Sequence, residues 1–206
     1  MEILESAKGG SMSRIVTKIV TAALCIGMMM SLASCAAAEP TSETTAEPTV
    51  ATSAPAGTGK RIYFAGPLFS QSEKDFNLEI VSLLEAHGYT VFLPQRDGIE
   101  AALLEGKTEE ELTEMIFALD ESEVKKADIV VINLDGRVPD EGACVELGIA
   151  YANGIRCYGI KTDTRSVESN MDLNPLITGC LIRLFKNYDG DALIAELDQY
   201  LAENEL

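Results

Sequence analysis

The sequence predicts a doubly wound α/β domain, built on a mainly parallel five-stranded sheet with helices on both of its faces. Apolar runs of strand length alternate with segments of helical spacing, and this order is typical of a parallel sheet. Residues 128–134 (DIVVINL) form a nearly unbroken apolar run, as a central strand covered on both faces requires. Residues 60–206 provide enough chain for one such layered domain.

The individual elements follow from the same patterns, in chain order. Strands are predicted at residues 61–65, 89–93, 128–134, 155–160 and 180–185. Helices are predicted at residues 70–87, from residue 108 onward, at 140–153 and at 191–203. Gly88 and Gly154 are expected to end two of these helices. The resulting layout is flavodoxin-like or Rossmann-like, with ligands expected beyond the carboxyl ends of the strands.

The helix that begins after Thr108 has a clear start signal. Thr108 is suited to cap the first turn, and the acidic residues Glu109 to Glu111 favour the positive end of the helix dipole. Four apolar residues at helical spacing are expected to form its buried stripe: Leu112, Met115, Ile116 and Leu119.

The N-terminal 35 residues have the layout of a secretory signal. Two cations precede an apolar stretch that starts at Ile19 and ends in small residues, and the stretch is too short for a comfortable membrane span. Leu32-Ala33-Ser34-Cys35 resembles the bacterial lipoprotein box, which predicts lipidation of Cys35 and anchoring to the outer side of the bacterial cell membrane. An ordinary signal peptide or a single anchor helix is the alternative, and Met12 is an alternative start.

A polar linker is predicted between this signal and the folded domain. Residues 36–59 are rich in Pro, Thr, Ser and Ala without periodicity, so they cannot bury enough apolar surface to order themselves. The net charge of the chain is −17, and all but the N-terminal segment carries 13 basic and 31 acidic residues. Such a surface repels phosphate backbones, so nucleic acid is not expected as a partner, whereas a small neutral ligand is not excluded.

Elimination leaves carboxylates as the candidates for chemistry. The single histidine, His87, precedes Gly88 and is expected to cap a helix, which removes histidine-based triads and His-rich metal sites. Three cysteines remain in the domain without CxxC spacing and are interpreted as buried thiols in two strands and a helix. No glycine-rich dinucleotide or P-loop motif follows the first strand, and neither a metal nor a cofactor is expected. The three cysteines are Cys144, Cys157 and Cys180.

Glu146 is the carboxylate in the most unusual setting. It follows Asp140, a predicted helix cap, by about one and a half turns and lies on an otherwise apolar helix. A carboxylate there is partly desolvated, which costs free energy unless the group is paired or used. The alternatives are that Glu146 faces solvent and that Asp140 is only a cap. Turn segments follow three predicted strands, at residues 66–69, 94–97 and 135–140, where this fold places its ligands, and polar residues cluster in the last two.

Four segments of the domain carry a resemblance to a known family. They are Tyr63-Phe64-Ala65-Gly66-Pro67-Leu68-Phe69, then Leu93-Pro94-Gln95-Arg96-Asp97-Gly98, then Asp120 eight residues before Asp128, and finally Asp140-x-Gly142-x-x-x-Glu146-Leu147-Gly148. In this order they span nearly all of residues 61–200 and resemble the nucleoside 2-deoxyribosyltransferase family.

The resemblance implies a retaining transfer of 2-deoxyribose from a 2'-deoxynucleoside to a free nucleobase. Glu146 would attack the anomeric carbon and form a covalent deoxyribosyl intermediate. Tyr63 would orient Glu146, and Asp120 would donate or relay a proton near the base. No cofactor takes part, and subunits of the family complete one another's sites, so a homo-oligomer is expected.

The resemblance also implies a set of substrate contacts. Asp140 would hold the sugar hydroxyls, Gln95 and Asp97 would touch the edge of the base, and Phe69 would pack on it. Asn174 would reach the sugar site of a neighbouring subunit. Two matched glycines complete the predicted substrate-binding set: Gly66 and Gly142.

Two other functions stay open at the level of sequence. One is hydrolysis of a 2'-deoxynucleoside or its 5'-monophosphate. A related branch binds phosphate with a serine- and arginine-bearing turn after the first strand. The turn here lacks arginine, which favours the unphosphorylated nucleoside as substrate. Ser70 at the start of the next helix is nevertheless compatible with phosphate binding. The second function that stays open is that of a non-catalytic, nucleoside-binding surface lipoprotein.

Overall fold

The computed structural model of the chain describes residues 57–165 and 171–206. The predicted signal segment (1–35), the lipidation site Cys35 and nearly all of the predicted linker (36–59) lie outside these residues. No helix in the described part of the chain has the length and apolar character needed to cross a membrane.

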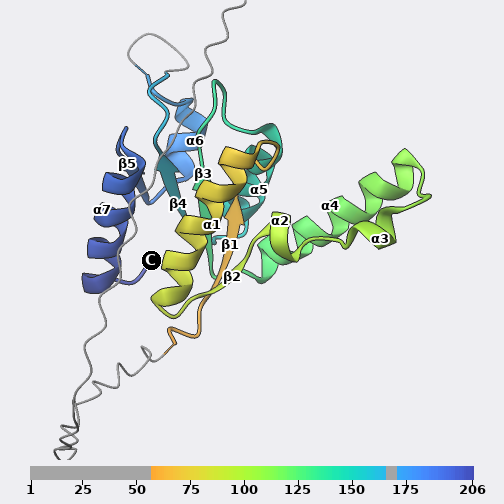
Figure 1. Ribbon diagram of the computed structural model, residues 1–206, viewed down its shortest axis with the longest axis horizontal. Coiled ribbons are helices and arrows are strands. Elements are labelled where there is room, and N and C mark those ends of the chain that lie inside the picture. The colour runs from red at the N-terminus through yellow and green to blue at the C-terminus, as the bar shows by residue number, and fades with distance from the viewer. Residues whose placement is uncertain (1–56, 166–170) are drawn as a thin grey trace, which may run out of the picture. The chain divides into compact units, whose positions relative to one another are not determined.

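Five parallel strands form one sheet in the order β2-β1-β3-β4-β5 (Figure 1). The strands are β1 (Arg61–Ala65), β2 (Thr90–Phe92), β3 (Ile129–Asn133), β4 (Arg156–Lys161) and β5 (Arg183–Lys186). The helices are α1 (Gln71–Ala86), α2 (Pro94–Asp97), α3 (Ala101–Leu104), α4 (Glu109–Lys126), α5 (Glu141–Ala152), α6 (Pro175–Cys180) and α7 (Gly190–Glu203). The predicted doubly wound α/β fold is therefore confirmed, with every strand pairing parallel.

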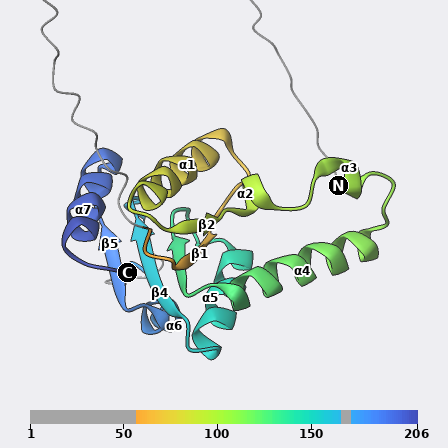
Figure 2. The same cartoon turned by 90° about the horizontal axis from the view of Figure 1, so that it is seen from below.

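Helices cover both faces of the sheet (Figure 2). α1 and α7 pack on one face, and α4, α5 and α6 lie on the other. Side chains of β1 alternate between these layers, as the period of a strand requires. Ile62 and Phe64 join the core beneath α1 and α7, whereas Tyr63 and Ala65 join the core beneath α4 and α5. The strand period thus directs Tyr63 towards the helix that carries Glu146.

The predicted caps are present in the structure. His87 is the C-cap of α1, and Thr108 begins α4 with a capping box that it forms with Glu111. Asp140 caps α5 by accepting a hydrogen bond from the Ala143 N–H at 2.8 Å. Asp140 thus sets the start of the helix on which Glu146 lies.

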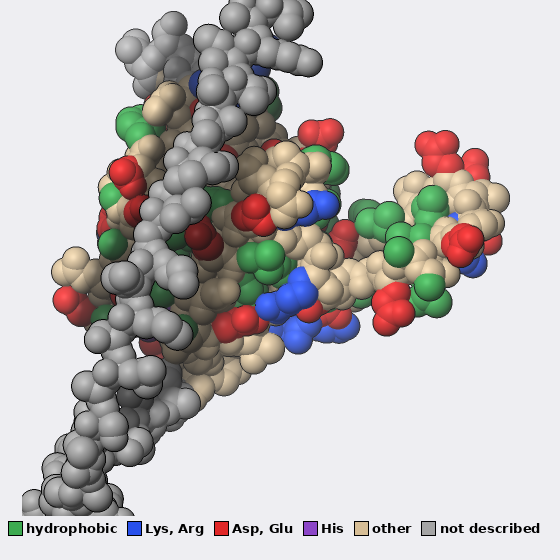
Figure 3. Space-filling view, in the orientation of Figure 1, with side chains coloured by type: hydrophobic (Ala, Val, Ile, Leu, Met, Phe, Trp, Pro, Cys, Tyr) green, Lys and Arg blue, Asp and Glu red, His purple; other side chains and the backbone are tan. Residues whose placement is uncertain are grey.

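The predicted buried stripe of α4 is wrong. Ile116 is 45% exposed, and the other stripe residues are only half-buried. The helix has 18 residues and so is about 27 Å long. The strand on which it packs, β1, has five residues and spans only about 17 Å. The first turns of α4, together with α3, therefore extend past the sheet as an arm (Figures 1 and 2), and hydrophobic side chains lie open on this arm (Figure 3).

A second correction concerns the last strand. The prediction placed a strand at residues 180–185, but β5 starts at Arg183, and Cys180 ends the helix α6. Asn174 caps this helix and Pro175 occupies its first turn, a combination that favours a helix start. Of the three cysteines in the described part of the chain, only Cys157 is a buried thiol in a strand, whereas Cys144 and Cys180 are half-buried on helices. The short helices α2 and α3 were also not predicted.

Candidate active site

Tyr63 and Glu146 meet on the face of the sheet that α4 and α5 cover. The Tyr63 hydroxyl donates a hydrogen bond of 2.7 Å to Glu146 Oε1. Tyr63 is completely buried and stacks on Phe92 with ring centroids 5.6 Å apart, so its ring has little freedom to move. The contact fixes one carboxylate oxygen of Glu146 and leaves the other without this bond.

The surroundings of Glu146 favour its neutral form. Burial is the main cause, and the negative charges of Asp120 and Asp140 act in the same direction. The hydrogen bond from Tyr63 opposes them, and the balance raises the pKa of Glu146 from 4.5 to about 7. Burial, followed by the nearby charge of Glu146, raises the pKa of Tyr63 well above its usual value, so this hydroxyl stays a donor. A carboxylate poised near neutral pH is typical of a functional site.

Glu146 opens into a pocket between α4 and α5. The pocket has a volume of about 450 Å³, and both Asp120 and Glu146 lie on its wall. Burial raises the pKa of Asp120 as well. Much of the remaining wall is apolar: Leu112, Ile116, Phe117, Val145 and Ile149.

Asp140 and Gly142 lie at the start of α5, close to this pocket. One carboxylate oxygen of Asp140 caps the helix, and the negative charge of Asp140 contributes to the raised pKa of Glu146. Gly142 lines the pocket, and a Cβ at this position would lie 3.2 Å from the Asp140 carboxylate. The absence of a side chain at Gly142 therefore keeps the approach to Asp140 open.

The turn after β1 reaches the same end of the sheet. A Cβ on Gly66 would lie only 2.8 Å from the Cβ of Asn133, so this turn packs directly on the end of β3. Phe69, further along the turn, has 77% of its surface exposed and makes no core contact. An exposed aromatic ring at this end of the sheet is available to pack on a ligand.

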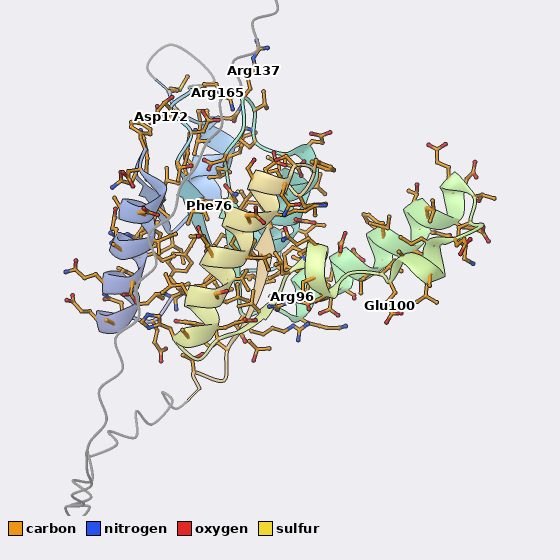
Figure 4. The ribbon with its side chains drawn as sticks, viewed as in Figure 1. Phe76, Arg96, Glu100, Arg137, Arg165 and Asp172 are labelled. Carbon is orange, nitrogen blue, oxygen red and sulfur yellow. The ribbon has the colours of Figure 1, made fainter. Side chains whose placement is uncertain are left out.

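Gln95 and Asp97 are already engaged with protein groups. Gln95 Oε1 accepts from Asn77, and Gln95 Nε2 donates to the carbonyl oxygen of Lys74 at 2.9 Å. Asp97 accepts from the Leu93 N–H and is paired with Arg96, which Figure 4 labels on α2. Asp97 thus holds the start of α2, while Gln95 keeps part of its hydrogen-bonding capacity.

Asn174 lies apart from the Glu146 pocket. Its side chain caps α6 by accepting from the Leu176 N–H at 2.9 Å. It lines a second pocket of about 400 Å³ with Cys144 and Leu147, residues on another face of α5 from Glu146. Within one chain, Asn174 is therefore not brought to Glu146.

Some residues of this region were not singled out from the sequence. Phe117 and Val145 form apolar walls of the pocket, and Asn77 and Asn133 are buried amides behind the turn after β1. Asn77 is three residues before Ile80 on the apolar face of α1, so a polar residue at a core position was the available signal. Among the described residues, no cluster of three or more His, Cys, Asp or Glu side chains could hold a metal ion.

Comparisons with known proteins identify a family and similar folds. The family model for nucleoside 2-deoxyribosyltransferases matches residues 62–200. A conserved protein from Enterococcus faecalis is 27% identical, with a TM-score of 0.55 over 68% of this chain and 98% of that chain. A 2-deoxyribosyltransferase from Bacillus psychrosaccharolyticus is 24% identical, with a TM-score of 0.55 over 68% of this chain and 91% of that chain. No curated protein gives a significant match.

The family match covers the segments that carry Tyr63, Asp120 and Glu146, from the first strand of the sheet into its last helix. It confirms the resemblance first recognised from the order of those segments. The chain belongs to the nucleoside 2-deoxyribosyltransferase family.

Proposed function

We propose that the protein transfers 2-deoxyribose between nucleobases through a covalent intermediate on Glu146. The observation that carries the proposal is the 2.7 Å hydrogen bond from a buried Tyr63 to Glu146, at the wall of a pocket that also contains Asp120. The family assignment supplies the substrate class, a 2'-deoxynucleoside and a free nucleobase.

The first half of the reaction breaks the bond between sugar and base. The free oxygen of the Glu146 carboxylate attacks the anomeric carbon, and the electron pair of the glycosidic bond moves onto the base nitrogen. Asp120, which lies with Glu146 on the wall of the pocket, donates or relays the proton that neutralises the leaving base. Asp140 accepts hydrogen bonds from the sugar hydroxyls with the oxygen that α5 does not use.

The second half of the reaction restores the enzyme. A nitrogen of the incoming base attacks the anomeric carbon from the face that the first base left, and the Glu146 carboxylate departs. Asp120 accepts the proton that the new base releases. Two inversions at the same carbon give net retention of configuration.

Tyr63 contributes by keeping Glu146 in one orientation. Because its own pKa is raised, it remains a hydrogen-bond donor throughout the working pH range. It stabilises the carboxylate that leaves in the second step without itself exchanging a proton.

A base-exchange assay between a 2'-deoxynucleoside and a second free base tests the proposal. Glu146→Ala should lose about a thousandfold or more in rate, as expected when a nucleophile is removed. Glu141→Ala provides a matched control, because Glu141 lies on the first turn of the same helix and is exposed. An exchange rate for Glu146→Ala equal to that of the control would rule out the proposed role.

The same assay without an acceptor base separates transfer from hydrolysis. Free deoxyribose formed at the exchange rate would identify a hydrolase, and binding without base release would identify a non-catalytic binder. Ser70 gives no particular support to a phosphorylated substrate. Its hydroxyl accepts from the Glu73 N–H, and the Glu73 carboxylate accepts from the Ser70 N–H, so the pair caps α1.

We also propose that the mature protein is anchored outside the cytoplasm through a lipid on Cys35. The support is the sequence of residues 14–35, all of which lie outside the described part of the chain. Growth with a labelled fatty acid should label the wild-type protein and not Cys35→Ser. Equal membrane association of the two proteins would contradict the anchor.

The proposal includes assembly into a homo-oligomer. Two observations support it: Phe117 and Leu103 lie exposed on the arm formed by α3 and the start of α4, and Asn174 faces a pocket away from Glu146. In an oligomer, Asn174 of one subunit could complete the sugar site of another. Sedimentation at assay concentration should give a species larger than the monomer, and an active monomer would contradict this part of the proposal.

A further inference from the structure

Three amide side chains connect the ends of three neighbouring strands. We call Gln95, Asn77 and Asn133 the amide chain. Asn77 is only 1% exposed, and a buried polar side chain requires partners. Asn77 Nδ2 donates to Gln95 Oε1 at 3.1 Å, and Asn133 Nδ2 donates to Asn77 Oδ1 at 3.0 Å. Asn133 Oδ1 in turn accepts from the Asp135 N–H.

The amide chain also holds two backbone carbonyls. Asn77 Nδ2 donates to the Pro67 carbonyl at 2.8 Å, which fixes the turn after β1. Gln95 Nε2 donates to the Lys74 carbonyl at 2.9 Å, which ties the start of α2 to α1. The ends of β1, β2 and β3 are therefore joined at the carboxyl edge of the sheet, where this fold places ligands.

The orientation of the Gln95 amide follows from these partners. Lys74 offers only a carbonyl oxygen, so Gln95 must direct its nitrogen there. Asn77 offers an N–H, so Gln95 must direct its oxygen to Asn77. One hydrogen of Nε2 and one lone pair of Oε1 stay free. The amide chain thus determines which of these two groups faces each part of a bound base.

We propose that Asn77 is a positioning residue that fixes the Gln95 amide and thereby sets which bases the enzyme prefers. The proposal rests on the proposed function and on Gln95 touching the base edge. Adenine and cytosine present an amino donor where hypoxanthine and uracil present a carbonyl acceptor. A Gln95 amide held in one orientation can match only one of these patterns at a given position.

Asn77→Asp tests the proposal with almost no change in shape. A carboxylate has no N–H, so both the bond to Pro67 and the bond to Gln95 Oε1 are lost. To bond the introduced carboxylate, Gln95 would have to turn its nitrogen towards it and set its oxygen against the Lys74 carbonyl. We expect the ratio of kcat/KM for 2'-deoxyadenosine over 2'-deoxyinosine to change by about fivefold or more, the equivalent of one net hydrogen bond.

Val81→Ala is the matched control. Val81 is 1% exposed on the same helix, one turn beyond Asn77, and its truncation removes packing without removing a hydrogen bond. It should lower the melting temperature and leave the base ratio unchanged. Asn77→Ala, which buries no charge, is the second variant and should change the ratio in the same experiment.

The outcomes separate the positioning role from the proposed function. Wild-type protein without base exchange or base release would refute the function itself. Active wild type, with Asn77→Asp and Asn77→Ala both retaining the base ratio of Val81→Ala, would refute the role of Asn77 and leave the function standing. A changed ratio in the folded Asn77 variants alone would support the inference.

Discussion

Replacing Glu146 by glutamine should stabilise the protein above neutral pH. Its pKa rises from 4.5 to about 7 on folding, mainly through burial, so the folded state holds this proton more tightly than the unfolded state. The stability that this protonation contributes is fully present below pH 4.5 and is lost as the pH rises through about 7. Glutamine keeps an oxygen to accept the Tyr63 hydrogen bond but carries no charge.

The size of the effect follows from the shift. Each pKa unit corresponds to about 1.4 kcal/mol, so the full shift would give about 3 kcal/mol, and solvent screening of the half-buried Glu146 side chain reduces this to about 2 kcal/mol. Urea unfolding of wild type and Glu146→Gln between pH 4.5 and 8.5 measures the difference, with Glu141→Gln as the exposed control. The advantage of Glu146→Gln should grow between about pH 5 and 8. A difference that is flat with pH would show that Glu146 is not a buried acid with a raised pKa.

Three further predictions concern Tyr63, Asp120 and Gly66. Tyr63→Phe removes the hydrogen bond that lowers the pKa of Glu146, so the acid limb of kcat/KM against pH should move to higher pH; an unmoved limb would contradict the contact. Asp120→Asn removes a nearby negative charge and should move that limb to lower pH, while slowing transfer by about a hundredfold or more because the leaving base loses its proton donor. Asp120→Asn with wild-type rates would exclude that role. Gly66→Ala places a Cβ 2.8 Å from that of Asn133 and should destabilise the protein by about 1 to 3 kcal/mol in thermal unfolding; wild-type stability would mean that the turn is free to move.

Most of the sheet could be predicted from the sequence because its strands carry a direct signal. A buried parallel strand needs an apolar run, and β3 has one from Ile129 to Ile132. The predicted start of β5 at residue 180 is wrong because Cys180, Leu181 and Ile182 form an apolar run that continues into the strand, although Cys180 belongs to α6. Asn174 and Pro175 favour the start of this helix.

The position of α4 could not be predicted from periodicity. An apolar stripe on a helix predicts a face that is buried against another element, but it does not say whether that element belongs to the same chain. Ile116 belongs to the stripe and yet lies on the wall of the Glu146 pocket, because the helix is longer than the strand it packs on. Exposed apolar residues on such an arm are typical of an interface.

The candidate site could be predicted only in part from the sequence. Glu146 and Asp140 are on one helix, so their spacing is visible in the sequence, whereas Tyr63 comes from a strand more than eighty residues away. In the sequence, only the order of the family-like segments associates Tyr63 with Glu146 and Asp140. Hydrogen-bond partners give no such signal. The engagement of Gln95 by Asn77 depends on how α1 and α2 pack, and neither residue type nor spacing specifies it.

Mass spectrometry of protein quenched during turnover tests the covalent role of Glu146 most directly. With a 2'-deoxynucleoside present, the peptide that contains Glu146 should gain the mass of one deoxyribosyl group and lose it again when a free base is added. Glu146→Gln should form no such adduct. Rapid base exchange by wild type with the peptide unmodified, or with the adduct on another carboxylate such as Asp120, would contradict the proposed mechanism.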